Sequence, residues 1–405
     1  MANSLLTPSV IAAECLRMFD NKLSFTSKID KQLSKEFAKS GAKIGNTITV
    51  RKPWRPSTRQ GPAISIQSVT EEMVPLVLSN QTGVDFTFTS QDLALTIDDF
   101  SNRYIKPAVV AAANYVDQQN LIMAAQNTFN AVGVSGTAPA TALLYLQAQQ
   151  KLNELATPFD GERSAFVNPA GSAAIVNALT GLFQSSEKIK EQYEKGMMGL
   201  AFGAEFYMAQ NVYSYTTGTG GTSSPTTLTT GSPQTGSSLS VVSWGSTSTA
   251  VAGDVFTIAG VYKVNPITKQ TIGTVLQQFV VTANATASGG AITNLAISPS
   301  IITSGPTQTV SAAPTTSAAI TLVTTANTGT ANNILCHKDA FTMGCADLEL
   351  PEGVHFAARA KDEESGLSIR IVRAYDINSD QIPCRLDILW GNAAFRPEWS
   401  CRLLG

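Results

Sequence analysis

The sequence predicts an α+β protein that is interrupted by an inserted all-β domain. Segments with apolar residues at helical spacing alternate with short segments in which every second residue is apolar. Near Thr216 the composition changes abruptly, because the only charged side chains between Thr216 and Ala331 are Asp254, Lys263 and Lys269. After Ala331 charged residues return. A composition that changes and then returns indicates a module inserted into one domain.

Length and charge limit the classes of function. A chain of 405 residues exceeds the usual size of one core and predicts two or three domains. The formal net charge of −2 excludes a strongly basic protein whose affinity rests on many phosphate contacts. The cysteines are scattered and odd in number, which indicates reduced thiols rather than a disulfide framework: Cys15, Cys336, Cys345, Cys384 and Cys401.

The N-terminal sequence favours a protein that is made and kept in a cytoplasm. It has neither the basic start nor the continuous apolar run of a signal peptide. No stretch approaches the ~20 apolar residues that span a bilayer. We therefore expect no membrane association.

Residues 1–45 are predicted to be a helical N-terminal arm. Apolar residues recur at helical spacing, at Val10, Ala13, Leu16, Phe19 and Leu23. Lysines follow at Lys28, Lys31, Lys35, Lys39 and Lys43. The lysines form either a basic face that binds a partner or a solvated helix face, and the solvated face is the simpler interpretation.

Residues 46–89 are predicted to form strands. Alternating apolar residues occur in the segments TITVR, AISIQ, VPLVL and GVDFTFT. The linking stretch RKPWRPSTRQGP cannot fold on itself, because it holds four cations, three prolines and Trp54. If the whole segment is one hairpin, each arm of ~18 residues spans ~60 Å, well beyond the ~21 Å radius of gyration of a compact chain of this length. Such an arm has to lie on another molecule, whereas a meander folded on its own domain is the open alternative.

The longest predicted helix runs from Asp98 to Asn127. It has an acidic first turn, and one stripe contains Val109, Ala113, Val116, Asn120 and Met123. At 1.5 Å per residue this helix would be ~44 Å long and would suit the spine of an elongated domain. A second helix at 140–156, the apolar strand SAFV and a helix after Asn168-Pro169 follow.

Residues 216–331 are predicted to fold as β-structure. The segments SWGSTSTAVAGDVFTIAGVYKV, VLQQFVVTANAT and AAITLVT alternate as strands do. A disordered low-complexity linker is the alternative, but the recurring β-branched and aromatic residues favour a folded module. Two C-terminal strands are expected in LSIRIVRAYD and CRLDILWG.

The sequence offers no catalytic, metal or cofactor site. His337 and His355 are the only histidines, and neither accompanies a nucleophile signature. The segment CHKDAFTMGC lacks the short cysteine pairs of structural zinc sites. The segment GMMGLAFG lacks the lysine of a P-loop and follows a predicted helix rather than a strand. We therefore expect a structural protein with no enzyme activity and no cofactor.

Three segments resemble one family, the major capsid proteins of tailed bacteriophages with the Hong Kong 97-type fold, and in particular the P22 type with an extra β-barrel domain. GDVFTIAGVYKVNPITKQTIGTVLQQFVVT resembles the core of that inserted domain. CRLDILWGNAAFRPEWSCRLLG resembles the C-terminal signature, and SAFVNPAGSAAIV resembles a strand, Asn-Pro and helix step. The order of elements is similar over nearly the whole chain.

The resemblance implies a division of the chain. Residues 1–45 would be the N-arm and 46–89 the extended loop on a neighbouring subunit. Residues 90–215 would hold the spine helix, the peripheral domain and the start of the axial domain. The insertion domain would occupy 216–331, and 332–405 would complete the axial domain and the C-terminal strands.

The resemblance also implies self-assembly into hexamers and pentamers of an icosahedral phage head around double-stranded DNA, without sequence-specific binding. Scaffolding and portal proteins would be further partners, and the protein would be located in the virion after assembly in the host cytoplasm. The residues expected at subunit interfaces are Arg51, Lys52, Trp54, Arg55 and Arg59 in the loop and Asn265 and Lys269 in the inserted domain. A phage tail component or a surface-layer subunit with an immunoglobulin-like domain is the alternative.

Overall fold

The computed structural model describes residues 8–20, 23–31, 47–56, 61–64, 66, 71–89, 106–178, 199–221, 227–228, 233–361 and 367–405. The chain divides into two compact units, each assembled from segments that are distant in sequence. Unit 1 comprises Met1–Val50, Met73–Asn120 and Phe341–Ala393. Unit 2 comprises Arg51–Glu72, Leu121–Ala340 and Ala394–Gly405.

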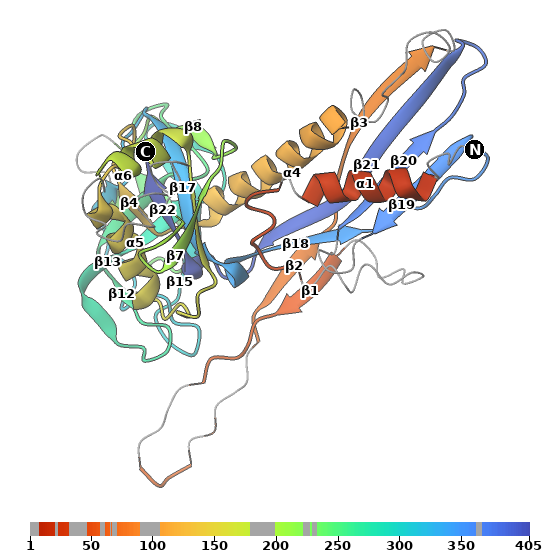
Figure 1. The fold of residues 1–405 in the computed structure, drawn as a ribbon. Helices are drawn as coiled ribbons and strands as arrows, with labels where there is room; N and C mark the ends of the chain where they lie inside the picture. Colours follow the sequence, from red (N-terminus) through yellow and green to blue (C-terminus); the bar gives the residue numbers. More distant parts are fainter. Residues whose placement is uncertain are drawn as a thin grey trace. The chain divides into compact units, whose positions relative to one another are not determined.

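Unit 1 is built on a five-stranded sheet around one long strand, β21 (Figure 1). Its strands are β3 (Asn80–Thr89), β18 (Phe341–Ala346), β19 (Phe356–Lys361), β20 (Ser368–Arg373) and β21 (Gln381–Ala394). β3 pairs antiparallel with β21 from Asn80 opposite Trp390 to Thr89 opposite Gln381. Trp390 is buried, and its Nε1 donates to Thr82 Oγ1 at 2.9 Å, so this tryptophan ties the two strands together.

Among the described residues, two helices belong wholly or partly to unit 1. α1 (Pro8–Asp20) packs against β19 and β20, and its buried residues are Ala12, Cys15, Leu16 and Phe19. The predicted helix does not continue through 23–31, which form turns and a single bridge at Asp30. The reason is a local polar network, because the buried Asp117 carboxylate accepts hydrogen bonds from Ser24 and from both the backbone and the hydroxyl of Thr26.

The second helix, α4 (Lys106–Asn127), confirms the described part of the long predicted helix. Four residues of the predicted stripe are buried, Val109, Ala113, Val116 and Asn120, whereas its fifth residue, Met123, is half-buried. Residues 98–105, where the helix was expected to begin, lie outside the described residues.

The described part of the segment predicted as four strands contains three. β1 (Thr47–Arg51) pairs with β2 (Met73–Val77), whereas β3 joins the sheet of β21. The prediction of a strand at AISIQ is wrong for the described residues, since Ile64 and Ile66 lie outside any strand with side chains 83% and 91% exposed. Alternation produces a strand only where a neighbouring strand supplies hydrogen bonds, and the described part of this chain supplies none here.

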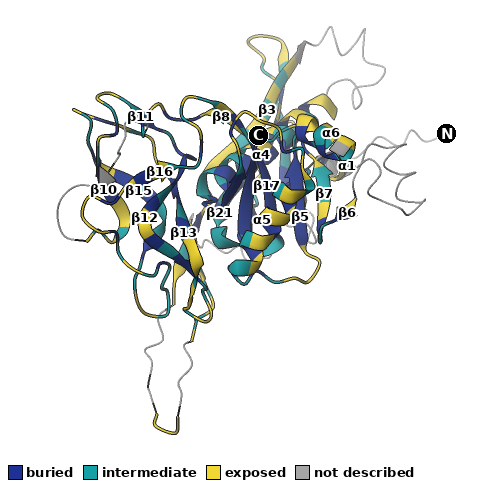
Figure 2. Ribbon diagram, turned by 90° about the vertical axis from the view of Figure 1, so that its left-hand side faces the viewer, coloured by how far each residue is buried: buried dark blue, intermediate teal, exposed yellow. Residues whose placement is uncertain are grey.

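Unit 2 contains a seven-stranded mixed sheet. In order across the sheet, its strands are β4 (Ala131–Gly133), β22 (Ser400–Leu404), β17 (Gly329–His337), β5 (Arg163–Val167), β7 (Ala204–Met208) and β6 (Leu200–Ala201), with β8 (Ser214–Thr216) pairing β17. β5 and β22 are buried along their whole length. Figure 2 shows buried β17 and β5 beside α5 (Ala142–Glu154), which exposes residues along its outer side.

The Asn-Pro step begins a helix as predicted. α6 (Pro169–Ala178) has proline at its first position, where the missing N–H is not needed. Asn168 caps this end, because its Oδ1 accepts from the Gly171 N–H at 2.8 Å. Asn333 of β17 holds the cap in place by accepting from the Asn168 N–H at 2.7 Å.

The inserted β-domain, defined here as residues 217–328, is folded where it is described, so the linker alternative does not hold there. One sheet runs in the order β16 (Ile320–Leu322), β12 (Val255–Val264), β13 (Thr271–Val281), β15 (Ile292–Ile301), β10 (Gly236–Val242) and β9 (Thr227–Leu228). β11 (Thr249–Ala250) and β14 (Ala285–Thr286) form a second, small sheet. The core is formed by Leu239, Trp244, Phe256, Ile258, Phe279 and Leu295 among others.

A short neck, formed by β8 and the start of β17, connects the inserted β-domain to the seven-stranded sheet. β8 and β17 pair antiparallel there, with Ser214 opposite Ala331 and Thr216 opposite Gly329. The chain therefore leaves the larger sheet and returns to it at one place. This geometry explains how a β-domain is accommodated without disrupting the sheet, and with the helices and mixed sheets it confirms an α+β fold with an all-β insertion.

Candidate functional site

The stem of the loop between β1 and β2 carries four of the residues expected at subunit interfaces. In the structure its cations are paired within the chain: Arg51 with Glu71 at 3.2 Å, Lys52 with Glu72 at 3.4 Å and Arg55 with Glu398 at 2.5 Å. Trp54 is half-buried, and its Nε1 has no hydrogen-bond partner among the described residues. Arg59 lies outside the described residues.

These ion pairs differ in exposure. The Arg51 side chain is 68% exposed, so its pair contributes little to stability. Arg55 and Glu398 are 31% and 15% exposed, and Glu398 belongs to the short helix η3 (Pro397–Trp399) next to β22. Arg55 therefore anchors the stem to its own unit. The inter-subunit role expected for these cations remains a prediction.

A cavity of about 280 Å³ lies beside this anchor. Its walls include two of the three ion pairs of the stem, Lys52 with Glu72 and Arg55 with Glu398, together with residues of the inserted β-domain such as Val264 and Gln308. The cavity combines charged groups of both signs with apolar surface.

The turn between β12 and β13 holds the other two expected interface residues, and both are engaged within the chain. Asn265 Nδ2 donates to the Glu154 carbonyl at 3.2 Å, and Asn265 Oδ1 accepts from the Ile267 and Thr268 N–H groups. The Lys269 ammonium donates to the Pro306 carbonyl. Burial, with a contribution from Arg55, lowers the pKa of Lys269. The turn presents Ile267, Thr268 and Gln270 outward, and the side chain of Ile267 is 67% exposed.

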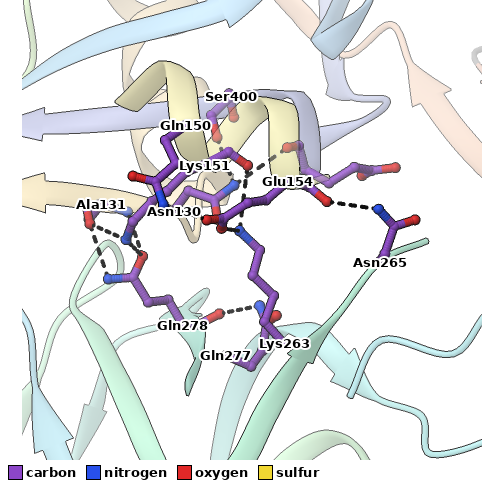
Figure 3. Close-up of polar contacts among 11 residues, drawn as sticks. Asn130, Ala131, Gln150, Lys151, Glu154, Lys263, Asn265, Gln277, Gln278 and Ser400 are labelled. Carbon is purple, nitrogen blue, oxygen red and sulfur yellow. Dashed lines mark hydrogen bonds and ion pairs between the residues drawn. The ribbon is translucent and has the colours of Figure 1, made fainter. Parts of the chain in front are cut away.

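A second polar cluster, which the sequence did not reveal, joins the inserted β-domain to α5 and β4 (Figure 3). We call it the joint, formed by Ala131, Lys151, Glu154, Lys263, Asn265 and Gln278. Lys263 Nζ lies 3.1 Å from Glu154 Oε2. Lys151 Nζ donates to the Ala131 carbonyl at 2.8 Å and to Gln278 Oε1 at 2.5 Å.

Ala131 and Lys263 of the joint are buried, its other residues are half-buried, and apolar residues flank it. The Lys263 side chain is only 4% exposed and that of Glu154 is 16% exposed. Val255 and Val280 of the inserted β-domain pack with Phe129, Ala131, Leu155 and Leu404. The signal that could have identified Lys263 is its position in β12, because it follows Val261 by two residues and so shares its buried face.

The neck contributes two more buried charged groups. The Arg402 guanidinium donates to the Gly253 carbonyl at 2.7 Å and to Asn332 Oδ1 at 3.1 Å. Asp254 accepts from the Gly218 and Val251 N–H groups, and burial raises the pKa of Asp254. These contacts fix the start of the inserted β-domain relative to β17 and β22.

The histidines and cysteines considered as catalytic or metal-binding residues are either separated from one another or buried. His337 is buried beside Asp160 at 3.1 Å and against Trp399, whereas His355 is exposed. All five cysteines are buried, and burial raises the pKa of Cys336 and of Cys345 to about 12. Within the described ranges, no three histidine, cysteine or acidic residues are grouped to hold a metal ion. In the same part of the chain, no helix has both the length and the apolar character needed to cross a bilayer.

Comparison with known proteins gives one match over the full length. The family model described as P22 coat protein, gene protein 5, matches residues 1–405. No curated protein matches the chain.

Several solved structures are similar to the chain at low identity. The structure from Mycobacterium phage Che8 is 12% identical, with a TM-score of 0.49 over 94% of this chain and 90% of that chain. The capsid of Ralstonia phage GP4 is 6% identical, with a TM-score of 0.47 over 94% and 87%. The capsid of cyanophage P-SCSP1u is 11% identical, with a TM-score of 0.41 over 89% and 83%.

Proposed function

Because the chain belongs to the P22 coat protein family and is thus a major capsid protein of a phage shell, we propose that its copies assemble into hexamers and pentamers of an icosahedral head around double-stranded DNA. The observation that carries the proposal is the match of one coat protein model to residues 1–405. The role is structural. A tail component or surface-layer subunit is not favoured, since neither accounts for a coat protein match over the whole chain.

The extended loop is the part of the chain that we assign to a neighbouring copy. Ile64 and Ile66 are the most exposed large apolar residues of the described chain, and they follow a stem that is anchored by Arg55. Exposed apolar side chains at alternating positions gain stability when a second surface covers them. We also assign residues 216–331 to an inserted domain and residues 1–45 to an N-terminal arm.

We infer the scaffolding and portal partners from the assembly of a shell. A shell built from many modest interfaces closes with the help of a scaffolding protein and is filled through a portal, and the mature protein is located in the virion. The formal net charge of −2 suits a shell that encloses DNA without gripping it.

The test is electron microscopy of the purified chain, expressed alone and together with neighbouring genes of its phage. We expect closed shells or sixfold rings from the native chain. The double variant Ile64→Asp/Ile66→Asp should remain folded by circular dichroism but should form no shells, because two carboxylates would have to be buried at each contact.

A matched control is Ser57→Asp/Thr58→Asp, which adds the same two charges to the same loop without removing apolar side chains. Shells formed by the Ile64/Ile66 variant would contradict the role given to the loop. Monomers of the native chain under both expression conditions would contradict the assembly itself.

A further inference from the structure

The joint contains more positive than negative charge. Lys151 and Lys263 face one carboxylate, that of Glu154, and the thiol of Cys401 is near both lysines. Cys401 supplies no negative charge near neutral pH, because burial raises its pKa to about 11. Two ammonium groups, that of the buried Lys263 and that of the half-buried Lys151, are therefore balanced by one carboxylate.

The hydrogen bonds of the joint are complete without the charge on Lys151 (Figure 3). The Ala131 carbonyl, which accepts from Lys151, also accepts from Gln278 Nε2 at 3.1 Å. Gln278 Oε1 likewise accepts from the Ala131 N–H at 2.9 Å. Neither acceptor would be left unpaired if Lys151 were neutral. Withdrawing the charged Lys151 ammonium from water therefore costs desolvation free energy, although neither acceptor depends on it as its sole donor.

The two lysines are not equivalent. Lys263 is held by an ion pair, since its Nζ lies 3.1 Å from Glu154 Oε2, and Glu154 is fixed in turn by Gln150 Nε2 at 2.8 Å. Lys151 donates instead to two neutral acceptors, the Ala131 carbonyl and Gln278 Oε1. The excess charge of the joint therefore resides on Lys151.

We propose that the joint is a charge-sensitive clamp, in which the inserted β-domain is held against α5 more tightly once Lys151 has lost its proton and more loosely while Lys151 is charged. The clamp lies within a single chain and goes beyond the proposed function. It can be tested on unassembled protein, so its outcome does not depend on shell formation.

The direction of the pH dependence follows from the burial of Lys151. Desolvation lowers the pKa of Lys151 to about 8, although Glu154 partly offsets the effect. When the inserted β-domain separates from α5, water reaches the amine and its pKa returns toward its usual value. The docked state therefore binds fewer protons than the separated state, and docking strengthens as pH rises through about 8.

The structure provides a direct reporter of docking in the backbone amide of Ala131. This N–H donates to a side chain of the inserted β-domain, Gln278 Oε1, so exchange of its hydrogen with solvent requires the joint to open. The Asn168 N–H is a matched control, since it also donates to an amide side chain, that of Asn333, but within the large sheet.

The experiment is hydrogen exchange with residue resolution at pH 7 and pH 9, expressed as protection factors that remove the pH dependence of the chemical step. We expect protection of the Ala131 amide to be about tenfold higher at pH 9 than at pH 7, and protection of Asn168 to be unchanged. In Lys151→Met the rise in Ala131 protection between pH 7 and pH 9 should be much smaller than in the native chain, and the remainder comes from Lys263, whose pKa burial also lowers. Lys338→Met, which removes an exposed lysine of the same unit, should keep the native pH dependence.

Three outcomes overturn the proposal. The first is an Ala131 protection factor in the native chain that is the same at both pH values. The second is an equal pH dependence at Ala131 and Asn168, which would indicate a general change in stability. The third is a Lys151→Met variant that folds and retains the native pH dependence. The first two need no variant, so the proposal can fail even if Lys151→Met does not fold.

Discussion

The joint and the tip of the extended loop differ in how far the chain itself covers their side chains. At the joint, Lys263 and Glu154 are almost fully withdrawn from water and satisfied within the chain. At the loop, Ile64 and Ile66 are almost fully exposed, and the stem below them is fixed by Arg55 and Glu398. The difference indicates which surfaces the chain has sealed against itself and which it leaves for another molecule to cover.

The largest expected effect on stability distinguishes a buried cation, Arg402, from an exposed one, Arg51. Arg402→Met should lower the free energy of unfolding by about 3 kcal/mol, because the Gly253 carbonyl and Asn332 Oδ1 lose a charged donor in a buried site. Arg51→Met should cost less than about 1 kcal/mol, because its pair with Glu71 is exposed. Urea-induced unfolding followed by circular dichroism measures both, and equal costs would remove the distinction.

A smaller effect separates two residues of the β12–β13 turn. Asn265→Ala should cost about 1 to 2 kcal/mol, since the Glu154 carbonyl loses a donor and two N–H groups of the turn lose an acceptor. Ile267→Ala should change stability by less than about 0.5 kcal/mol, because its side chain is mostly exposed. The same urea unfolding measurement compares the free-energy costs of the two substitutions. A larger cost for Ile267 than for Asn265 would show that the turn is stabilised by the residue we assign to the surface.

Much of the fold was predictable because periodicity identifies elements that bury one face. The stripe from Val109 to Asn120 marks α4, and the alternation in LSIRIVRAYD marks β20. The Asn-Pro step marks the start of α6, because proline and an amide cap favour a helix N-terminus. The change in composition near Thr216 lies at the neck, where β8 pairs with β17.

The failures arose where a local pattern depends on a distant partner. Ile64 and Ile66 alternate as a strand does, but no strand of the described chain pairs with them. Residues 23–31 were expected to be helical, and the buried carboxylate of Asp117 holds Ser24 and Thr26 in turns instead. Asn265 and Lys269 make hydrogen bonds within the chain that the sequence did not indicate, and their place at a subunit contact stays a prediction. The joint was missed because α5 and β13 meet only after the inserted β-domain has docked.

The most direct test of the account asks what lies next to Ile66 in an assembled particle. A photoreactive phenylalanine analogue at position 66 should produce covalent ladders of dimers and larger species after irradiation of shells, and only monomers after irradiation of unassembled chains. The same analogue at the buried position Ile258 should give no ladder in either sample. A position 66 that reacts only with its own chain in assembled shells would contradict the claim that the loop is completed by another copy.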